Sequence, residues 1–347
     1  MNNVASSLVN GVLSIKPLAR FAKNRARSMM MDRAETLGVY WRDEVKVLRS
    51  RNHPSETERL NNDFHPQWEK ERSQITNPTL AYPSYYTSSF HAYDEGNLGW
   101  LPAMEVSAAA RAVHARIWSV PDERAGVEGD ASLRSSYHQA LSDRLPAAPS
   151  QIIDLGCSTG LSSFALQKSY PSAQITGVDL SPHFLTVAQY VVNHSTTGYA
   201  NVNADELAAG ESVDGESASG EPTNRSIRWV HAAAEETGLP EASADLVSAC
   251  LVFHELPTTA ARNVMTEAYR LVRPGGHFAI MDMDPQSEAF AKMPPYVLTL
   301  LKSTEPFLDQ YFTLDIAETL KSIGFDTPHI VRNSPRHRTV IAQKPTS

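Results

Sequence analysis

The sequence predicts an α/β protein: a doubly wound, mostly parallel seven-stranded sheet with a C-terminal antiparallel hairpin, preceded by a mainly helical N-terminal extension. Three observations lead to this fold class. After Pro149, five apolar runs of strand length alternate with helical stretches, which is typical of a parallel sheet covered by helices on both faces. Two more apolar runs near the C-terminus are joined by a short polar turn, as in a hairpin. Upstream of residue 149, apolar residues recur at helical spacing instead.

The seven expected strands are short, and polar or glycine-containing segments separate them. They span residues 151–156, 175–179, 227–232, 246–253, 277–283, 329–333 and 339–343. Residues 149–347 are therefore predicted to form one domain. Within it, residues 196–224 are acidic and rich in Gly and Ser, so we expect a disordered surface insertion there.

Residues 1–148 are predicted to form the helical extension. We expect two or three helices between residues 15 and 72, one over 104–117, and a short one through Tyr137, after an acidic linker over 122–130. The segment 82–100 is dense in aromatic residues and punctuated by Pro and Ser. It has two interpretations, a lid-like segment over a ligand or core packing against the extension.

The bulk composition favours a small-molecule partner. The formal net charge is −8 and the pI is about 5.8, whereas nucleic acid or an anionic membrane surface would favour a basic protein. No apolar run is long enough for stable membrane insertion. We therefore expect a soluble protein that binds no nucleic acid.

The two cysteines, Cys157 and Cys250, fall inside predicted core elements. This placement argues against a disulfide framework and predicts a cytoplasmic location. No Cys and His cluster has metal-ligand spacing, so no metal is predicted. The first 31 residues are basic and contain no acid. That composition fits a basic first helix or, alternatively, a plastid or mitochondrial transit peptide.

The first chemical motif closes the first strand of the sheet. It reads Asp154-Leu-Gly156-Cys157-Ser158-Thr-Gly160 and leads into a helix. Glycines at this point let the backbone approach a ligand at the carboxyl end of a strand. A dinucleotide fingerprint needs two further glycines, but this chain has Ser158 and Leu161 there. The sequence therefore argues against a nicotinamide-dependent dehydrogenase.

A second acid, Asp179, closes the next strand. A carboxylate at this position can accept two hydrogen bonds from a ribose diol. The alternative is an ordinary turn residue before a helix that Ser181 caps. We expect the ribose contact.

The D-x-G-x-x-x-G spacing resembles the first motif of class I S-adenosylmethionine-dependent methyltransferases. Matching segments follow in the family's order, including Ala234-Glu235, the end of the fourth strand and the Gly275-Gly276 turn. The resemblance implies a methyltransferase with S-adenosyl-L-methionine as cofactor. The cofactor-binding residues that it implies are Asp154, Gly156, Cys157, Ser158, Gly160, Asp179, Leu180, Ala234, Glu235 and Val252. Where many relatives carry Asp this chain has Ala233, so backbone amides around Ala234 are expected to hold the adenine.

Outside these motifs, the chain resembles a subgroup of uncharacterised plant, algal and cyanobacterial methyltransferases. Its core is similar to the ubiquinone and menaquinone C-methyltransferases, which implies C-methylation of a quinone-like ring. A second possibility is S- or O-methylation of a small carboxylic acid, such as a thioether acid in sulfonium biosynthesis. Arg332, Arg336 or Arg338 could then clamp the carboxylate. A non-catalytic cofactor-binding scaffold is the alternative from a different class.

Methyl transfer from a sulfonium is an in-line displacement, so the protein mainly supplies proximity and alignment. A general base helps only if the acceptor must lose a proton. His254, at the end of the fourth strand, is the predicted catalytic residue, although contact with backbone or cofactor would also explain it. Other candidates near the predicted site are Asp282 and Asp284 on the fifth strand and, less strongly, His91, Tyr93, Tyr137 and His138.

Overall fold

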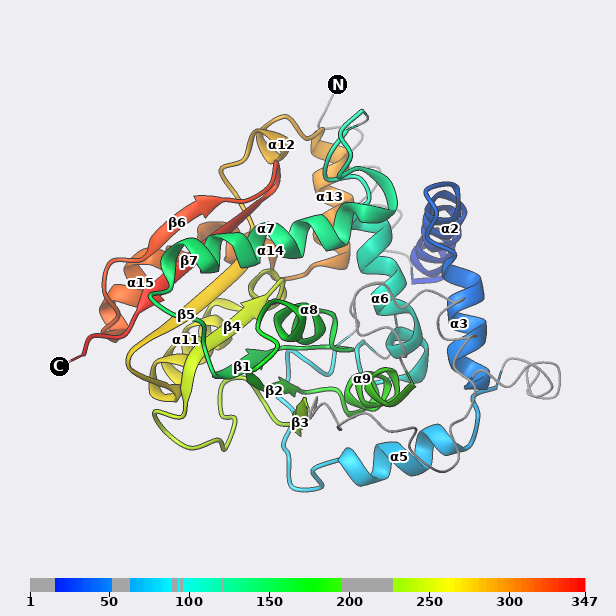
Figure 1. Cartoon of the computed structure of the whole chain (residues 1–347). Coiled ribbons are helices and arrows are strands. Elements are labelled where there is room, and N and C mark those ends of the chain that lie inside the picture. Colours follow the sequence, from blue (N-terminus) through cyan, green and yellow to red (C-terminus); the bar gives the residue numbers. More distant parts are fainter. Residues whose placement is uncertain are drawn as a thin grey trace.

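The computed structural model has a seven-stranded sheet with strand order β3-β2-β1-β4-β5-β7-β6 (Figure 1). The described residues are 16–51, 63–88, 93, 96–119, 121–194 and 227–346, with the backbone alone for 16–24. The strands are β1 (Gln151–Leu155), β2 (Gln174–Asp179), β3 (Arg228–His231), β4 (Ala244–Cys250), β5 (Val272–Met283), β6 (His329–Arg332) and β7 (His337–Gln343). The first five are parallel, and β7 runs antiparallel to both β5 and β6. The predicted fold class is confirmed.

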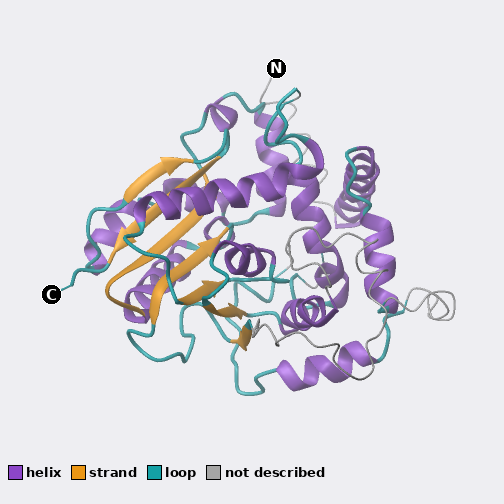
Figure 2. Ribbon diagram, in the orientation of Figure 1, coloured by secondary structure: helices purple, strands orange, loops and turns teal. Residues whose placement is uncertain are grey.

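Helices cover both faces of the sheet (Figure 2). On one face lie α2 (Lys16–Thr36), α3 (Trp41–Ser50), α5 (Gln67–Ile75), α6 (Trp100–His114), α7 (Gly129–Arg144), α8 (Leu161–Ser169) and α9 (Pro182–His194). On the other lie α11 (Thr258–Leu271), α14 (Leu308–Thr313) and α15 (Ile316–Ile323). Two short helices, α12 (Glu288–Ala291) and α13 (Pro295–Thr304), join β5 to α14.

The central strands supply both cores, because successive side chains point to opposite faces. Leu246 packs into the core under α7 and α8, while Val247 packs into the core under α11. Ile152 and Ile153 on β1 divide in the same way. A parallel sheet that is buried on both faces therefore explains the continuous apolar runs.

Two predicted boundaries were wrong, one at the carboxyl edge of the sheet and one at its amino edge. Strand β4 ends at Cys250, not at residue 253, and a 3₁₀ turn, η2 (Phe253–Glu255), carries His254. The Gly275-Gly276 pair does not form a separate turn but lies inside β5. There a Cβ on Gly276 would stand 2.9 Å from the Asp245 carbonyl oxygen. The glycine is needed because strands β4 and β5 approach closely at their irregular start.

Among the described residues of the N-terminal extension, three helices precede residue 76, in agreement with the predicted two or three. They share one core with the sheet, in which the fully buried Trp68 donates from Nε1 to the Leu48 carbonyl at 3.0 Å. The predicted acidic linker is shorter than expected, because a 3₁₀ turn, η1 (Gly126–Glu128), and helix α7 begin within it. The domain division at residue 148 stays a prediction. The expected insertion over 196–224 lies outside the described residues.

No helix within the described ranges has both the length and the apolarity needed to cross a bilayer.

Truncation of a central strand residue tests the two-sided core. We expect Leu246→Ala to lower the free energy of unfolding by about 2–5 kcal/mol, since the side chain is fully buried between two neighbouring strands. Val113→Ala on α6, where the side chain is 48% exposed, is the control and should change it by no more than about 0.5 kcal/mol. Equal effects of the two substitutions in urea unfolding would contradict this core.

Candidate active site

The carboxyl ends of β1, β2 and β4 meet at one edge of the sheet, where open α/β folds bind ligands. The loop after β1 turns back over β2, because the Gly156 and Cys157 N–H groups donate to the Val178 carbonyl at 2.8 and 3.1 Å. Gly156 and Gly160 have φ of 69° and 91°, which glycine adopts without strain. The two glycines of the loop motif therefore stand at positions where the backbone has a positive φ.

Asp179 organises this loop. One of its carboxylate oxygens accepts the Ser158 N–H at 2.8 Å and the other accepts the Ser181 N–H at 2.7 Å. Ser181 also caps the following helix by accepting the Phe184 N–H at 3.2 Å. Burial raises the pKa of Asp179 to about 6, against the opposing effect of the two backbone hydrogen bonds. Asp179 is therefore both a turn residue and an oriented carboxylate that is charged at neutral pH.

Asp154 is fully buried at the end of β1. Its Oδ2 accepts the hydroxyls of Ser162 and Ser163, both at 2.6 Å. Burial raises the pKa of Asp154 to about 6, while these hydroxyls and the guanidinium of Arg134 oppose the shift. The two serines follow the glycine loop directly, but the sequence analysis did not identify them as partners of this acid.

Three buried side-chain oxygens at this edge have no hydrogen-bond partner among the described residues. They are Asp154 Oδ1, Ser158 Oγ and Glu235 Oε2. Buried acceptors are normally satisfied, so three orphans together indicate a ligand that carries donors. S-adenosylmethionine carries an ammonium group, two ribose hydroxyls and an adenine amino group. The residues present therefore fit the cofactor that the sequence implies.

The aromatic segment lies over the same edge. The Tyr86 hydroxyl donates to Asp179 at 3.4 Å and the Tyr85 hydroxyl donates to Glu235 Oε1 at 2.6 Å. The Tyr82 hydroxyl lies 3.1 Å from Nε2 of His231, at the end of β3. Residues 82–88 thus reach the acids of two successive loops. The aromatic residues marked this segment in the sequence as a possible lid. Its hydrogen-bond partners could not be predicted, because they lie about 90 to 150 residues away in the chain.

The backbone after β4 is unusual. Leu251 has φ of 61°, a region in which a bulky side chain is rarely found. This places Val252 against the first loop, where a Cβ on Gly156 would stand only 2.6 Å from a Val252 methyl group. The absence of a side chain at Gly156 therefore lets the loops after β1 and β4 meet.

His254 and Asp282 form a buried pair. His254 Nδ1 lies 2.7 Å from Asp282 Oδ1, and the His254 N–H donates to Asp282 Oδ2 at 3.2 Å. Burial alone would lower the pKa of His254, but the Asp282 carboxylate, with Glu255 and Glu305 nearby, raises it above its usual range. At neutral pH the pair is an imidazolium bonded to a carboxylate.

Of the other predicted residues, some lie at the carboxyl edge of the sheet and some do not. The Leu180 carbonyl lies 2.9 Å from Nε2 of His231 at the edge, and Cys157 is buried beside it. Tyr137 and His138 lie elsewhere, since they bond to Ser248 at 2.9 Å and to Ser169 at 2.7 Å.

The remaining weak candidates also lie away from the cofactor edge or outside the structure. Tyr93 donates to Glu105 on α6 at 2.6 Å. His91 lies outside the described residues. Tyr93 therefore bonds to the helical extension, and His91 stays a prediction.

The three candidate arginines lie in two different places. Arg332 pairs with Asp284 at 2.5 Å, and Arg332 and Arg338 both line a groove beside the β6–β7 hairpin. Arg336 instead donates to the Arg116 carbonyl at 3.2 Å. Of the three arginines, Arg332 and Arg338 thus lie together at one groove.

The sequence analysis missed a buried polar cluster behind β1 and β4. Asp130 on α7 accepts from Arg134 at 2.8 Å and lies 2.6 Å from Nδ1 of His114. Arg134 also contacts Cys250 Sγ at 3.5 Å. The helical spacing of Asp130 and Arg134 is typical of a surface ion pair, so burial could not be deduced from it.

No group of three His, Cys, Asp or Glu side chains with metal-binding geometry occurs in the part of the chain that the structure describes.

Comparisons with known proteins identify a methyltransferase domain in the chain. Residues 153–280 match a family model described as a methyltransferase domain. An uncharacterised methyltransferase of Synechocystis sp. is 24% identical over 190 residues, which cover 54% of this chain and 73% of that protein.

Solved structures also show likeness to the chain. A putative O-methyltransferase from Nostoc punctiforme is 14% identical with a TM-score of 0.48, covering 88% of this chain and 73% of that chain. A magnesium protoporphyrin IX methyltransferase from Synechocystis with bound SAH is 17% identical with a TM-score of 0.40, covering 62% and 83%.

The protonation state of His254 can be measured directly. In an NMR titration we expect the His254 imidazole to have a pKa of about 10, because the Asp282 carboxylate stabilises its charged form. In Asp282→Asn the carboxylate that raises the pKa of His254 is lost, while burial still lowers it. The pKa should therefore fall toward or below the ordinary 6.5. His254→Asn assigns the resonance, and an ordinary pKa in the unmodified protein would refute the ion pair.

Proposed function

We propose that this methyltransferase transfers the methyl group of S-adenosyl-L-methionine to a small molecule bound over the carboxyl edge of the sheet. Residues 153–280 match a methyltransferase domain, so the chain is an enzyme, and its sequence motifs imply S-adenosylmethionine as the cofactor. One observation supports the location above all others. The orphaned oxygens of Asp154, Ser158 and Glu235 belong to the ends of β1 and β3 and the loops after them, at one edge of the sheet, and polar groups of a ligand would satisfy them.

Each part of the cofactor has a matching group. The Asp179 carboxylate has about four acceptor sites and takes two backbone hydrogen bonds and one long 3.4 Å bond from Tyr86. It would accept the ribose diol if one ribose hydroxyl takes the place of the Tyr86 hydroxyl. The free oxygen of Asp154 would accept the ammonium group, and Glu235 with the backbone of Ala234 would hold the adenine. Around the methionine part we place the backbone of Gly156, Cys157, Ser158 and Gly160, with Leu180 and Val252 as apolar contacts.

The bound cofactor supplies an activated methyl group. The chain then has to align the acceptor and exclude water. The tyrosines of residues 82–88 contact Asp179, His231 and Glu235, and we propose that they act as the lid over the cofactor. His254 is the proposed catalytic residue on the acceptor side, where as an imidazolium it donates a hydrogen bond.

Two acceptor chemistries are open to such a site. C-methylation of a quinone-like ring requires a base to take a proton from the ring, and His254 is already protonated at neutral pH. A thioether already carries a free lone pair and loses no proton. The charge of His254 therefore favours S-methylation of a small thioether carboxylic acid over the quinone-like ring.

Cofactor turnover tests the proposal. Formation of S-adenosylhomocysteine is measured with quinols, phenols, thiols and thioether acids as acceptors, and at least one should be consumed. A non-catalytic scaffold would bind the cofactor but turn over no acceptor. A protein that binds neither S-adenosylmethionine nor S-adenosylhomocysteine in calorimetry would overturn the function altogether.

Removing the Asp179 carboxylate should weaken cofactor binding. We expect Asp179→Ala to raise the Kd for S-adenosylhomocysteine by about 100-fold, because hydrogen bonds to a charged group are lost. Asp326→Ala removes an exposed carboxylate far along the chain and is the matched control. Calorimetry should find it unchanged, and an equal effect of both variants would show that Asp179 has no direct contact.

Cofactor affinity should also depend on pH. The pKa of Asp179 is raised to about 6 by burial, so the carboxyl becomes protonated as the pH falls below this value. A protonated acid accepts fewer hydrogen bonds, and the Kd should rise by up to about tenfold per pH unit below 6. Asp154, whose pKa is also raised to about 6, contributes to the same profile, so Asp179→Asn should reduce its slope without removing it. A profile that is flat from pH 5 to 8 in the unmodified protein would rule out the role.

A further inference from the structure

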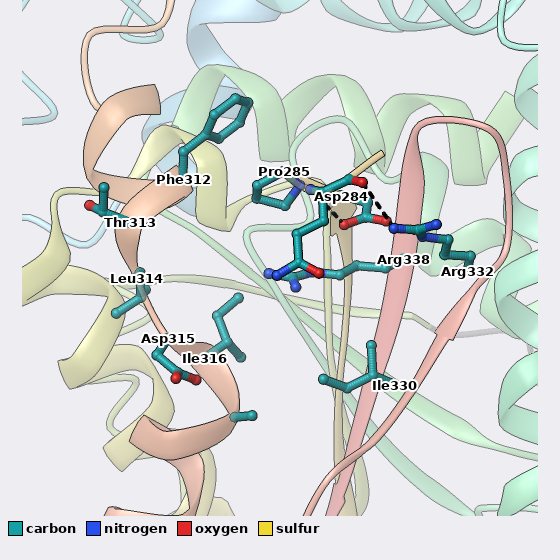
Figure 3. Close-up of a pocket in the computed structure, with 12 residues that line it drawn as sticks. Asp284, Pro285, Phe312, Thr313, Leu314, Asp315, Ile316, Ile330, Arg332 and Arg338 are labelled. Atoms are coloured by element: carbon teal, nitrogen blue, oxygen red, sulfur yellow. Dashed lines mark hydrogen bonds and ion pairs between the residues drawn. The ribbon is translucent and has the colours of Figure 1, made fainter. Parts of the chain in front are cut away.

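A groove of about 500 Å³ lies between the β6–β7 hairpin and the α14–α15 junction. We call it the arginine groove. Asp284, Arg332 and Arg338 form its polar part, and Leu314, Ile316 and Ile330 form its apolar walls (Figure 3). Figure 3 shows the Arg338 side chain extending across the groove toward the helices.

The sheet register connects the groove with His254. Arg338 on β7 lies directly opposite Asp282 on β5 and opposite Arg332 on β6. Residues opposite one another in antiparallel strands point to the same face, with Cβ atoms about 5 Å apart. Asp282, Arg338 and Arg332 therefore form one row across the sheet, and His254 bonds to the first of them.

Charge pairing along this row leaves Arg338 without a carboxylate partner. Asp282 is neutralised by His254, and Asp284 by Arg332 at 2.5 Å. Asp315, also in the groove, accepts the Glu318 N–H at 2.9 Å as a helix cap. Within the described ranges, Arg338 forms no salt bridge.

Arg338 is also short of hydrogen-bond partners. Its Nε is buried and no acceptor among the described residues reaches it, although the guanidinium lies against the Tyr311 hydroxyl. That hydroxyl donates to the Met283 carbonyl at 2.6 Å, and the Tyr311 ring stands 6.4 Å from the His254 ring. A half-buried guanidinium with an unused donor is costly unless an anion binds it.

We propose that the arginine groove binds the carboxylate of the methyl acceptor, with Arg338 as the main contact and Arg332 at its side. The planar guanidinium fork matches a carboxylate. The apolar part of the acceptor lies on Leu314, Ile316 and Ile330, and its reacting atom extends past Tyr311 toward His254. The inference rests on the proposed function, because it assigns part of the acceptor to the same site.

Binding of matched ligand pairs tests the groove. The protein is saturated with S-adenosylhomocysteine, and calorimetry measures phenylacetate, octanoate and (methylthio)acetate, each beside its uncharged amide. We expect at least one acid to bind about tenfold more tightly than its amide, because only the acid offers a charged acceptor to Arg338. Arg338→Gln should remove this preference, and Arg338→Lys should restore part of it.

Arg262→Gln on α11, where the arginine is exposed, is the control and should keep the full preference. The same melting temperature with and without each substitution shows that the variants fold. Acids that bind no better than amides, or a preference that survives Arg338→Gln, overturn the groove while the cofactor still binds. If S-adenosylhomocysteine fails to bind but the Arg338-dependent preference persists, the proposed function is wrong and the anion site stands.

Discussion

The Asp179 carboxylate links three parts of the molecule that are distant in sequence. It holds the loop after β1 through the Ser158 N–H, it shapes the entry to α9 through the Ser181 N–H, and it receives the Tyr86 hydroxyl from the N-terminal extension. A buried charge is stable only when several donors surround it. Because those donors come from separate segments, the geometry of the cofactor edge and the position of the aromatic segment depend on this one group.

A comparable constraint acts at the end of β5. Asp282 and Asp284 point to one side of the sheet, and each holds a cation, His254 or Arg332. Arg338 lies between Asp282 and Arg332 in the sheet register and forms no salt bridge among the described residues. In the proposed complex, His254 would donate a hydrogen bond near the reacting end of the acceptor and Arg338 would contact its carboxylate. This arrangement would suit a small anionic acceptor better than a neutral ring.

Local patterns predicted most of the fold. The strands were predicted to within a few residues, because a sheet buried on both faces requires continuous apolar runs. The ends of β4 and the start of β5 were predicted wrongly. At Leu251 and Gly276 the backbone responds to Val252 and to the Asp245 carbonyl, and these contacts are made by neighbouring strands. Ser162 and Ser163 were also missed, since their role depends on the buried oxygen of Asp154.

The sequence by itself determined the fold class and the residues at the carboxyl edge of the sheet, because glycine spacing and strand-end acids are local features. Only the tertiary structure decided that Tyr86 reaches Asp179, that His254 is paired with Asp282, and that Arg338 rather than Arg336 faces a groove. Pairing across a sheet and burial of charge depend on segments far apart in the chain. The charge of His254 depends on residues such as Asp282, which lie far from it in the chain, so a local sequence pattern cannot predict it.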